Sequence, residues 1–166
     1  MIEVPAWLES LTRAFSASGH QLYLVGGAVR EGLLGGERGL VRRRSGRLAI
    51  VTGGEWDLAT DAKPTEVENV LRPLTKKIGL IGKRYGTVTA ELKGHLVEIT
   101  TFRSEDYAEF SRQPTVKFGA TINEDLSRRD FTVNAVAYDL VGKQLLDPHQ
   151  GQKDLGRQII RAVGEP

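Results

Sequence analysis

Short segments of helical and of strand-like periodicity alternate irregularly along the chain, and this pattern constrains the fold more than any other feature. Helical spacing or flanking turn signals predict helices at residues 5–18, 28–34, 64–72 and 122–129. Short apolar or alternating runs predict strands at residues 22–25, 55–60, 86–91 and 96–102. Lys93-Gly94 would join the last two in a hairpin, whereas residues 133–140 fit either a strand or a buried helix. The irregular order predicts an α+β domain with a mixed sheet flanked by helices.

The composition is that of one globular domain. With 166 residues and 40% hydrophobic content, the chain has the length and apolar share for one sizeable core. The absence of cysteine excludes disulfides, thiolate zinc sites and a cysteine nucleophile, so any metal must be held by oxygen or imidazole ligands. No stretch has the character of a signal peptide or a membrane span, and we therefore expect a cytoplasmic protein without membrane contact.

Residues 36–54 have the character of an insertion between glycine pairs. An apolar patch at 48–51 could be a strand or half of a hairpin. The same region holds a basic cluster, which consists of Arg38, Arg42, Arg43, Arg44 and Arg47. The formal net charge of the chain is only +2, so overall basicity is weak evidence for nucleic acid. The cluster could contact phosphates or form a solvated loop.

Two acidic residues, Glu55 and Asp57, lie two positions apart on a predicted strand. Residues i and i+2 of a strand point to the same face, so these carboxylates would lie side by side while Trp56 and Leu58 face the core. Magnesium ions would relieve the repulsion between the carboxylates, because Mg²⁺ prefers hard oxygen ligands. The alternative is a solvated acidic face.

Glu98 is a candidate third carboxylate. It lies between Val97 and Ile99 on the strand expected at 96–102, where an acid facing a core would be costly without a partner. It could complete a metal site with Glu55 and Asp57. The alternative is an alternating strand whose polar face simply carries Glu98 and its neighbours.

The segment from Gly26 to Arg30 combines a glycine turn with the start of a helix. Backbone amides at such a turn allow close approach of a triphosphate, and Arg30, one turn into the helix, could pair with phosphate oxygens. Gly26-Gly27 could equally be only a tight turn between strand and helix. It is not a P-loop, because the Lys-Ser/Thr ending is absent.

Two further polar clusters are candidates for contact with phosphates, sugars or RNA. In the first, Arg128 and Arg129 have the fork geometry that suits phosphate or sugar oxygens, and Asp130 could orient an arginine or a ribose hydroxyl. The alternative for this cluster is an internal Arg–Asp salt bridge. In the second, Lys83 and Arg84 lie in a glycine-bounded loop that could touch RNA or serve as an ordinary hairpin entry.

The histidines do not suggest a hydrolase. His20, His95 and His149 are widely spaced, and none of them is paired with a serine or aspartate in a recognisable nucleophile arrangement. We expect them at the surface.

Taken together and in order, several motifs resemble one known family. They are LVGGAVR (24–30), WDLAT (56–60), EITTFR (98–103), RRDFTVNA (128–135), and Asp147-Pro148 with Gly151. The set closely resembles the bacterial (class II) CCA-adding tRNA nucleotidyltransferase and poly(A) polymerase family, over about residue 20 to Glu165. The resemblance implies the DNA polymerase beta-like nucleotidyltransferase fold.

The resemblance also implies roles for individual residues. Glu55 and Asp57 would hold Mg²⁺, and Glu98 would be a supporting catalytic acid. The triphosphate would be bound at Gly26, Gly27, Arg30 and Arg129. Asp130 and Asn134 would shape the sugar pocket, and the segment 103–118 matches the family's flexible loop, which helps the site switch between CTP and ATP. RNA contacts are expected from Lys83, Arg84 and Arg103.

The chain departs from the family pattern in three ways. Glu55 stands where aspartate is usual, so the geometry or affinity of the metal site is in doubt. The region 36–54 is longer than the usual connection. The family continues into neck, body and tail domains where this sequence stops, so residues 1–166 are expected to be a truncated catalytic head.

The function implied by the resemblance is template-independent addition of CCA to tRNA 3′ ends, from CTP and ATP, by two-metal nucleotidyl transfer. Within the same family, poly(A) polymerase activity and CC-only or A-only addition are alternatives. From another class, the chain could be a non-catalytic RNA- or nucleotide-binding module. A small-molecule nucleotidyltransferase of the antibiotic type would not account for the Arg129-Asp130 motif.

Overall fold

The computed structural model describes residues 5–34, 39–42, 48–51, 56–106, 115–119 and 121–164. For the strands at 39–42, 48–51, 104–106 and 115–118 only the backbone is described. The predicted strand residue Glu55 and the side chains of all five arginines of the cluster therefore lie outside what the structure describes.

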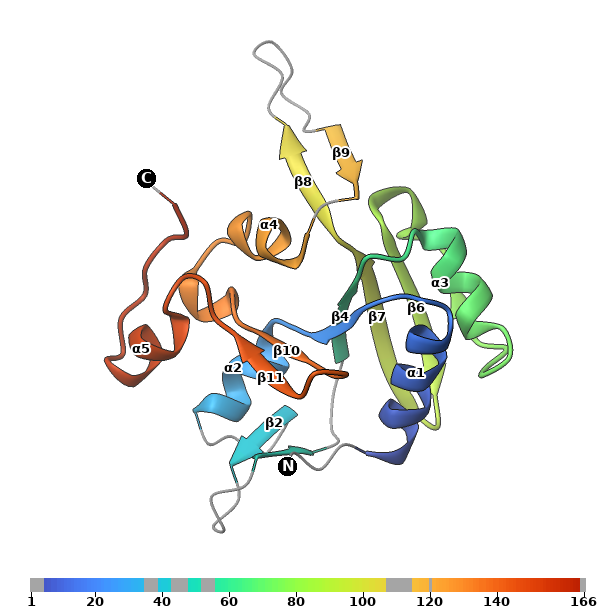
Figure 1. Ribbon diagram of the computed structural model, residues 1–166, viewed down its shortest axis with the longest axis horizontal. Helices are drawn as coiled ribbons and strands as arrows, with labels where there is room; N and C mark the ends of the chain where they lie inside the picture. The colour runs from blue at the N-terminus through green and yellow to red at the C-terminus, as the bar shows by residue number, and fades with distance from the viewer. Residues whose placement is uncertain are drawn as a thin grey trace.

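A seven-stranded mixed sheet forms the centre of the described structure, in the order β11-β10-β1-β4-β7-β6-β5 (Figure 1). Its strands are β1 (Leu22–Leu24), β4 (Trp56–Thr60), β5 (Ile78–Gly79), β6 (Thr87–Leu92), β7 (His95–Thr101), β10 (Ala137–Asp139) and β11 (Gln144–Leu146). Strands β4 and β7 are parallel, and the other neighbours in the sheet are antiparallel. Two separate hairpins pair β2 (Gly39–Arg42) with β3 (Leu48–Val51), and β8 (Arg103–Asp106) with β9 (Thr115–Phe118).

Helices cover both faces of the sheet. They are α1 (Ala6–Ala17), α2 (Gly27–Leu33), α3 (Pro64–Leu71), α4 (Ile122–Ser127) and α5 (Gly151–Gly156), with short 3-10 helices η1 (Lys83–Tyr85) and η2 (Thr132–Asn134). On one face, α1 and α3 pack on Trp56, Leu58 and Ile99 in the larger core cluster. On the other face, α4 packs on Ala59 and Phe102 in a smaller cluster. The two-residue alternation of β4 thus separates the cores and leaves Asp57 on the α4 side.

The predicted α+β class and mixed sheet are confirmed, and so are the predicted helices and strands to within a residue or two over the part described. Lys93 and Gly94 form the expected hairpin turn, with φ values of 52° and 84°. The patch at 48–51 is the second strand of a hairpin. Residues 133–140, for which either a strand or a buried helix was expected, form neither along their whole length. The segment begins within η2 and continues into the short strand β10. Elements β5, β8, β9, β11 and α5 were not predicted as such.

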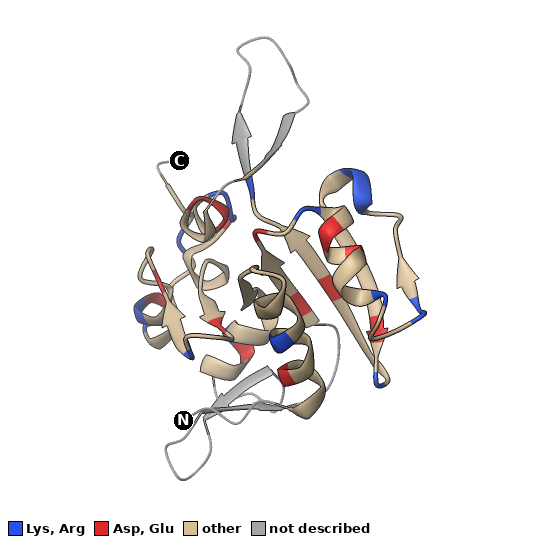
Figure 2. Cartoon of the chain, turned by 45° about the vertical axis from the view of Figure 1, so that its right-hand side comes forward, with Lys and Arg blue, Asp and Glu red and all other residues tan. Residues whose placement is uncertain are grey.

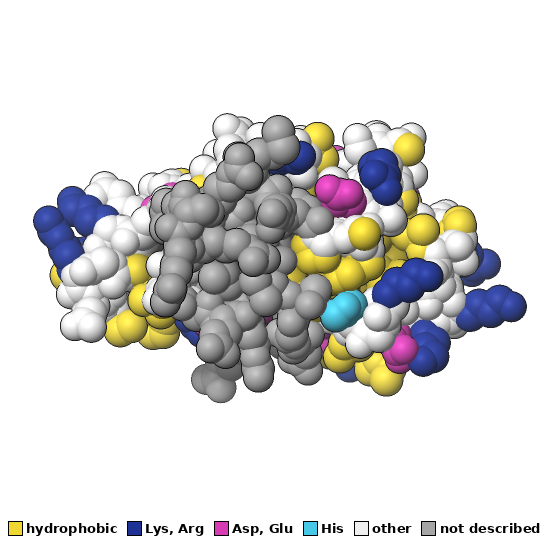
Figure 3. Space-filling view, turned by 90° about the horizontal axis from the view of Figure 1, so that it is seen from below, with side chains coloured by type: hydrophobic (Ala, Val, Ile, Leu, Met, Phe, Trp, Pro, Cys, Tyr) yellow, Lys and Arg dark blue, Asp and Glu magenta, His cyan; other side chains and the backbone are white. Residues whose placement is uncertain are grey.

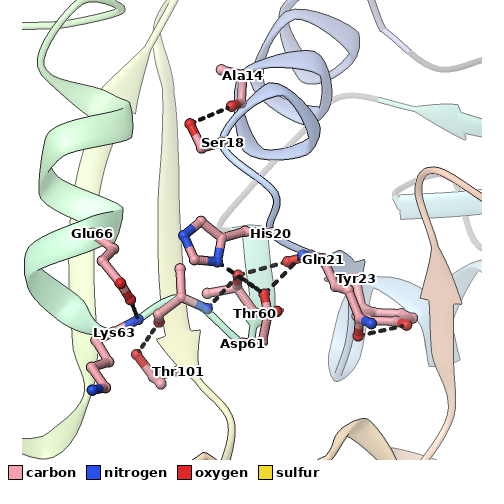
Figure 4. A network of polar contacts seen from close by, with 11 residues as sticks. Ala14, Ser18, His20, Gln21, Tyr23, Thr60, Asp61, Lys63, Glu66 and Thr101 are labelled. Atoms are coloured by element: carbon pink, nitrogen blue, oxygen red, sulfur yellow. Dashed lines mark hydrogen bonds and ion pairs between the residues drawn. The ribbon is translucent and has the colours of Figure 1, made fainter.

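Buried threonines fix the ends of β4 and β7 (Figure 4). The Thr60 hydroxyl donates to the Gln21 carbonyl at 2.6 Å and accepts from the Ala62 amide at 3.1 Å. The Thr101 hydroxyl donates to the Ala62 carbonyl at 2.7 Å, and the Gln21 amide donates to Asp61 at 2.8 Å. Because these bonds satisfy polar groups at the strand ends, they hold the register of the two strands that carry Asp57 and Glu98.

Among the helices that the structure describes, none combines the length and apolarity needed to cross a bilayer.

Candidate functional site

Asp57 and Glu98 are opposite each other on the parallel strands β4 and β7. Both are half-buried, and their flanking residues Trp56, Val97 and Ile99 are buried on the other face. Since neighbouring strands are about 5 Å apart, the two carboxylates leave adjacent points on the same face of the sheet. The sequence predicted Glu55 beside Asp57, with Glu98 as a further carboxylate, and the strand register places Glu98 opposite Asp57. The third acid, Glu55, lies outside the described residues.

The glycine turn lies directly against Asp57. Gly26 has φ 68° and ψ −142°, and a Cβ atom at this position would lie 3.0 Å from the Asp57 Oδ2 atom. The Val25 amide donates to the Asp57 carbonyl at 3.0 Å, which ties the end of β1 to β4. Glycine is needed here both because the φ is positive and because the backbone approaches the carboxylate closely. The turn therefore brings backbone amides next to the acid pair.

Arg30, one turn into α2, reaches across to η2. Its Nη1 atom donates to the Asn134 Oδ1 atom at 2.5 Å, and Asn134 Nδ2 donates to Asp130 Oδ1 at 3.0 Å. The Asp130 carboxylate also accepts from the Phe131 amide at 2.7 Å. The Asn134 hydrogen bond is the main cause that lowers the pKa of Asp130, so this carboxylate is an acceptor at neutral pH. The structure thus joins three of the predicted nucleotide-binding residues in one chain of contacts.

A buried carboxylate, Asp125 on α4, holds both predicted arginines. Asp125 Oδ1 accepts from Arg128 Nε at 3.1 Å and from Arg128 Nη2 at 2.8 Å, while Oδ2 accepts from Arg129 Nη2 at 3.2 Å. The internal Arg–Asp salt bridge considered from the sequence therefore exists, but the acid is Asp125 rather than Asp130. Asp130 contacts Asn134 instead.

Strands β4, β7 and β8, the end of β1 beside the glycine turn, and the end of α4 contribute residues to a pocket of about 220 Å³. It is lined by Val25, Asp57, Leu58, Thr100, Arg103, Arg128 and Arg129. Three arginines against one carboxylate make the lining electropositive, which suits an anionic ligand that carries phosphates. Figure 2 shows basic and acidic residues side by side on α4, and a basic segment at the base of β8.

The donor chemistry of Asp57 and Glu98 fits a hard cation such as Mg²⁺. Two carboxylates on one face supply oxygen ligands, which Mg²⁺ prefers, and this ion usually needs only one or two of them besides substrate phosphates. Within the described residues no group of three or more His, Cys, Asp or Glu side chains is placed to hold a metal. Asp57 and Glu98 are two described residues that could hold the ion.

The predicted RNA-binding residues lie in and beside η1. Lys83 Nζ pairs with Glu68 Oε2 at 2.6 Å, and this hydrogen bond, followed by that from Arg72, lowers the pKa of Glu68. The guanidinium carbon of Arg84 lies 4.5 Å from the centre of the Tyr85 ring, in cation–π geometry. Arg103 lines the pocket, and its Nη1 atom donates to the Tyr85 carbonyl at 2.9 Å. Lys83 therefore has an internal partner, while Arg84 is exposed.

The expectation for the histidines needs correction. His20, His95 and His149 are all half-buried rather than fully at the surface. His20 Nδ1 lies 3.4 Å from Asp61 Oδ1, and His149 Nε2 lies 3.1 Å from Ser127 Oγ. The ring of His95 stacks on Trp7 at 4.9 Å. The Asp61 and Ser127 contacts belong to different elements, so they do not combine into a triad.

Asp125 was missed in the sequence, although its spacing carried a signal. It precedes Arg128 and Arg129 by three and four positions, which places an acid on the same helix face as a following base. The Arg128-Arg129-Asp130 run instead suggested Asp130 as the acid that pairs with an arginine. Helical spacing across residues 122–129 would have favoured Asp125.

Solved structures with a similar fold identify the class of this domain. One is the crystal structure of the Bacillus stearothermophilus CCA-adding enzyme in complex with CTP, with a TM-score of 0.72 and 34% identity over 96% of this chain and 33% of that chain. Another is the Thermotoga maritima CCA-adding enzyme complexed with tRNA, with a TM-score of 0.64, 26% identity, and coverage of 93% and 31%. The chain has the DNA polymerase beta-like nucleotidyltransferase fold of these enzymes.

The particular family follows from sequence comparison. Residues 22–161 match the family model described as the Poly A polymerase head domain, and the chain belongs to this family. The CCA-adding enzyme of Bacillus subtilis (strain 168) is 39% identical over 155 residues, which cover 93% of this chain and 34% of the relative. That of Geobacillus stearothermophilus is 40% identical over 148 residues, with coverage of 89% and 32%. The chain thus spans about a third of the length of these curated relatives, and the expected family resemblance is confirmed.

Proposed function

We propose that the protein adds nucleotides from CTP and ATP to the 3′ end of tRNA, building the CCA terminus without a template. The observation that carries the proposal is the register pairing of Asp57 and Glu98 next to the Gly26 turn and the arginine-lined pocket. The relatives support it, because they are CCA-adding enzymes and their solved structures include complexes with CTP and with tRNA.

In this proposal the 3′ hydroxyl oxygen of the RNA attacks the α-phosphorus of the bound nucleotide. A new phosphodiester bond forms, the bond from the α-phosphorus to the bridging oxygen breaks, pyrophosphate leaves, and the proton of the hydroxyl passes to solvent. The turn at Gly26-Gly27, Arg30 and Arg129 position the triphosphate, while Asp130 and Asn134 bind the sugar. Catalysis then depends mainly on positioning and on stabilising the charge on the phosphates.

Asp57 and Glu98, together with Glu55, would hold Mg²⁺. When bound, Mg²⁺ activates the attacking hydroxyl and neutralises charge on the leaving pyrophosphate. Asp57 is held in place by the turn against which it packs, and its backbone carbonyl accepts from Val25. The substitution of glutamate at position 55 for the usual aspartate keeps the charge but lengthens the side chain by one methylene.

The test is incorporation of labelled CTP and ATP into tRNA that lacks its CCA end, with the full-length protein. We expect ordered addition of C, C and A, and a loss of at least about 100-fold in rate for Asp57→Asn, which keeps the size of the side chain and removes its charge. The matched control is Asp139→Asn, because Asp139 lies on β10 and accepts only turn amides in the described structure. Full activity of Asp57→Asn would refute the mechanism.

A second candidate function is polyadenylation, because the matching family model is described as the Poly A polymerase head domain. Addition of ATP to a generic RNA, with no addition to tRNA, would move the assignment to poly(A) polymerase. Products that stop at CC, or a single A added only to tRNA ending in CC, would indicate partial CCA addition. Binding of CTP with no transfer to any RNA would leave a non-catalytic binding module.

A further inference from the structure

Asp125 is the most buried charged residue beside the candidate pocket, with 1% of its surface exposed. Its carboxylate binds both guanidiniums of the Arg128–Arg129 pair, with two bonds to one and one bond to the other. Oδ1 also lies 3.4 Å from the backbone amide of Arg103, at the first residue of β8. All three residues that Asp125 contacts line the pocket, whereas Asp125 does not.

The charges of Asp125, Arg128 and Arg129 determine how this group interacts with an anionic ligand. One carboxylate between two guanidiniums leaves a net charge of about +1, so the pair stays attractive to an anion while the repulsion between the arginines is reduced. Each guanidinium uses one edge toward Asp125 and has five N–H donors in a rigid fork, so its remaining donors have a fixed direction. Side chains of Arg128 and Arg129 are 17% and 20% exposed, which leaves part of each accessible to a ligand.

Arg129 depends on this contact for its position. Its Nε atom is buried and makes no hydrogen bond within the described part of the chain. The bond from Nη2 to Asp125 is therefore the polar contact that orients its guanidinium there. Without the carboxylate no hydrogen bond within the described residues would fix the direction of this guanidinium, and the order of a long side chain is entropically costly to maintain without such a contact.

We propose that Asp125 is a positioning residue for the nucleotide's phosphates. It directs Arg128 and Arg129 toward the phosphate groups and ties them to Arg103 at the base of the β8–β9 hairpin. This inference rests on the proposed function, because it requires that the pocket bind a nucleoside triphosphate. It predicts that the contribution of the phosphates to binding, rather than that of the base and sugar, depends on Asp125.

The test compares the affinities of CTP and CMP for the full-length protein by calorimetry, in the wild type and in Asp125→Asn. The asparagine keeps the shape and one acceptor oxygen but loses the charge. We expect CTP affinity to fall by about tenfold or more, the size of a lost charge-assisted contact, while CMP affinity changes by less than about twofold. The CTP:CMP preference should therefore fall.

The matched control is Asp154→Asn. Asp154 is another buried acid, and it accepts from Thr132 and from the guanidinium of Arg161 away from the pocket lining. A purely structural role predicts that both variants lower the Tm and leave the CTP:CMP preference intact. A positioning role predicts that only Asp125→Asn changes the preference.

If Asp125→Asn has no cooperative thermal transition, Asp125→Glu is the second variant. It keeps the charge and displaces the carboxylate by one methylene, so we expect a CTP:CMP preference below that of the wild type. If the variant that folds keeps the wild-type CTP:CMP preference, Asp125 is not a positioning residue. The proposed function would stand in that case. A wild-type protein that bound CTP no more tightly than CMP would instead contradict the proposed function.

Discussion

Gly26 is a residue at which the backbone closely approaches the carboxylate of Asp57. Its φ of 68° lies in the left-handed half of conformational space, and a Cβ atom would stand 3.0 Å from the Asp57 Oδ2 atom. A side chain at this position would therefore strain the backbone and press on the carboxylate together. The structure allows these two effects to be separated, because Gly94 has a similar φ of 84° and open space around it.

We predict that Gly26→Ala reduces nucleotide addition by about 100-fold, since a shift of about 1 Å in a reacting group can cost that much. Gly94→Ala should leave the rate unchanged, while both variants lose about 1–2 kcal/mol of stability through backbone strain. The measurements are steady-state addition to tRNA lacking CCA, and urea unfolding of each variant. Equal rates for the two variants would show that the approach of Gly26 to Asp57 does not matter.

The sequence predicted those site residues whose environment is set by short-range periodicity. Alternation along a strand placed Asp57 on the face opposite Trp56 and Leu58, and Glu98 was proposed as a further carboxylate. That Glu98 lies opposite Asp57 follows from the pairing of β4 with β7, which the sequence did not predict. Asp125 was missed although its spacing to Arg128 and Arg129 follows the helical period. Its contact with the Arg103 amide, by contrast, depends on where α4 packs against β8 and is contained in no local pattern. Glu55 remains a prediction, as do the roles of the remaining site residues in binding and catalysis.

At the scale of elements, length decided what could be predicted. Helix α1 and strands β6 and β7 are long enough to show their period, and their bounds were close to those observed. Strand β5 has two residues and strands β10 and β11 have three, so none of them repeats the two-residue alternation of a strand even twice. These strands are set by pairing with neighbours in the sheet rather than by their own sequence.

Strand β10 also contains a buried tyrosine whose hydroxyl makes no hydrogen bond in the described part of the chain. Burial, with a smaller effect of Asp139, raises the pKa of Tyr138 to about 12. We predict that Tyr138→Phe is more stable by about 1 kcal/mol in urea unfolding, because it removes a buried, unsatisfied hydroxyl. A large loss of stability would instead show that the hydroxyl has a partner.

The pH dependence of the same variant gives a second measurement. The unfolded tyrosine ionises near its ordinary pKa of 10.0, whereas the folded one does so at about 12. The stability that depends on the neutral hydroxyl is therefore complete below pH 10 and is lost as the pH rises from 10 to 12. We expect the advantage of Tyr138→Phe over the wild type to grow across this range.

For the whole molecule, the distribution of charge matters more than its sum. A formal net charge of +2 gives little general attraction to RNA. On the face shown in Figure 3, the basic side chains drawn in colour are scattered among hydrophobic, acidic and uncharged ones. Among the described residues, the basic ones beside the site are the candidates for phosphate contacts, and they are not equally available. Lys83 is paired with Glu68, whereas Arg84 is exposed and rests on Tyr85.

We predict that Arg84→Ala weakens binding of tRNA lacking CCA by roughly fivefold at 0.15 M salt and lowers the slope of log affinity against log salt by about 0.8, which is the signature of one lost phosphate contact. CTP affinity should not change, because Arg84 does not line the pocket. Arg13→Ala is the control: it removes the same charge from α1, which packs on the face of the sheet away from Asp57, and Arg13 does not line the arginine pocket. If both variants lowered the slope equally, the effect would be that of total charge, and Arg84 would have no direct contact with RNA.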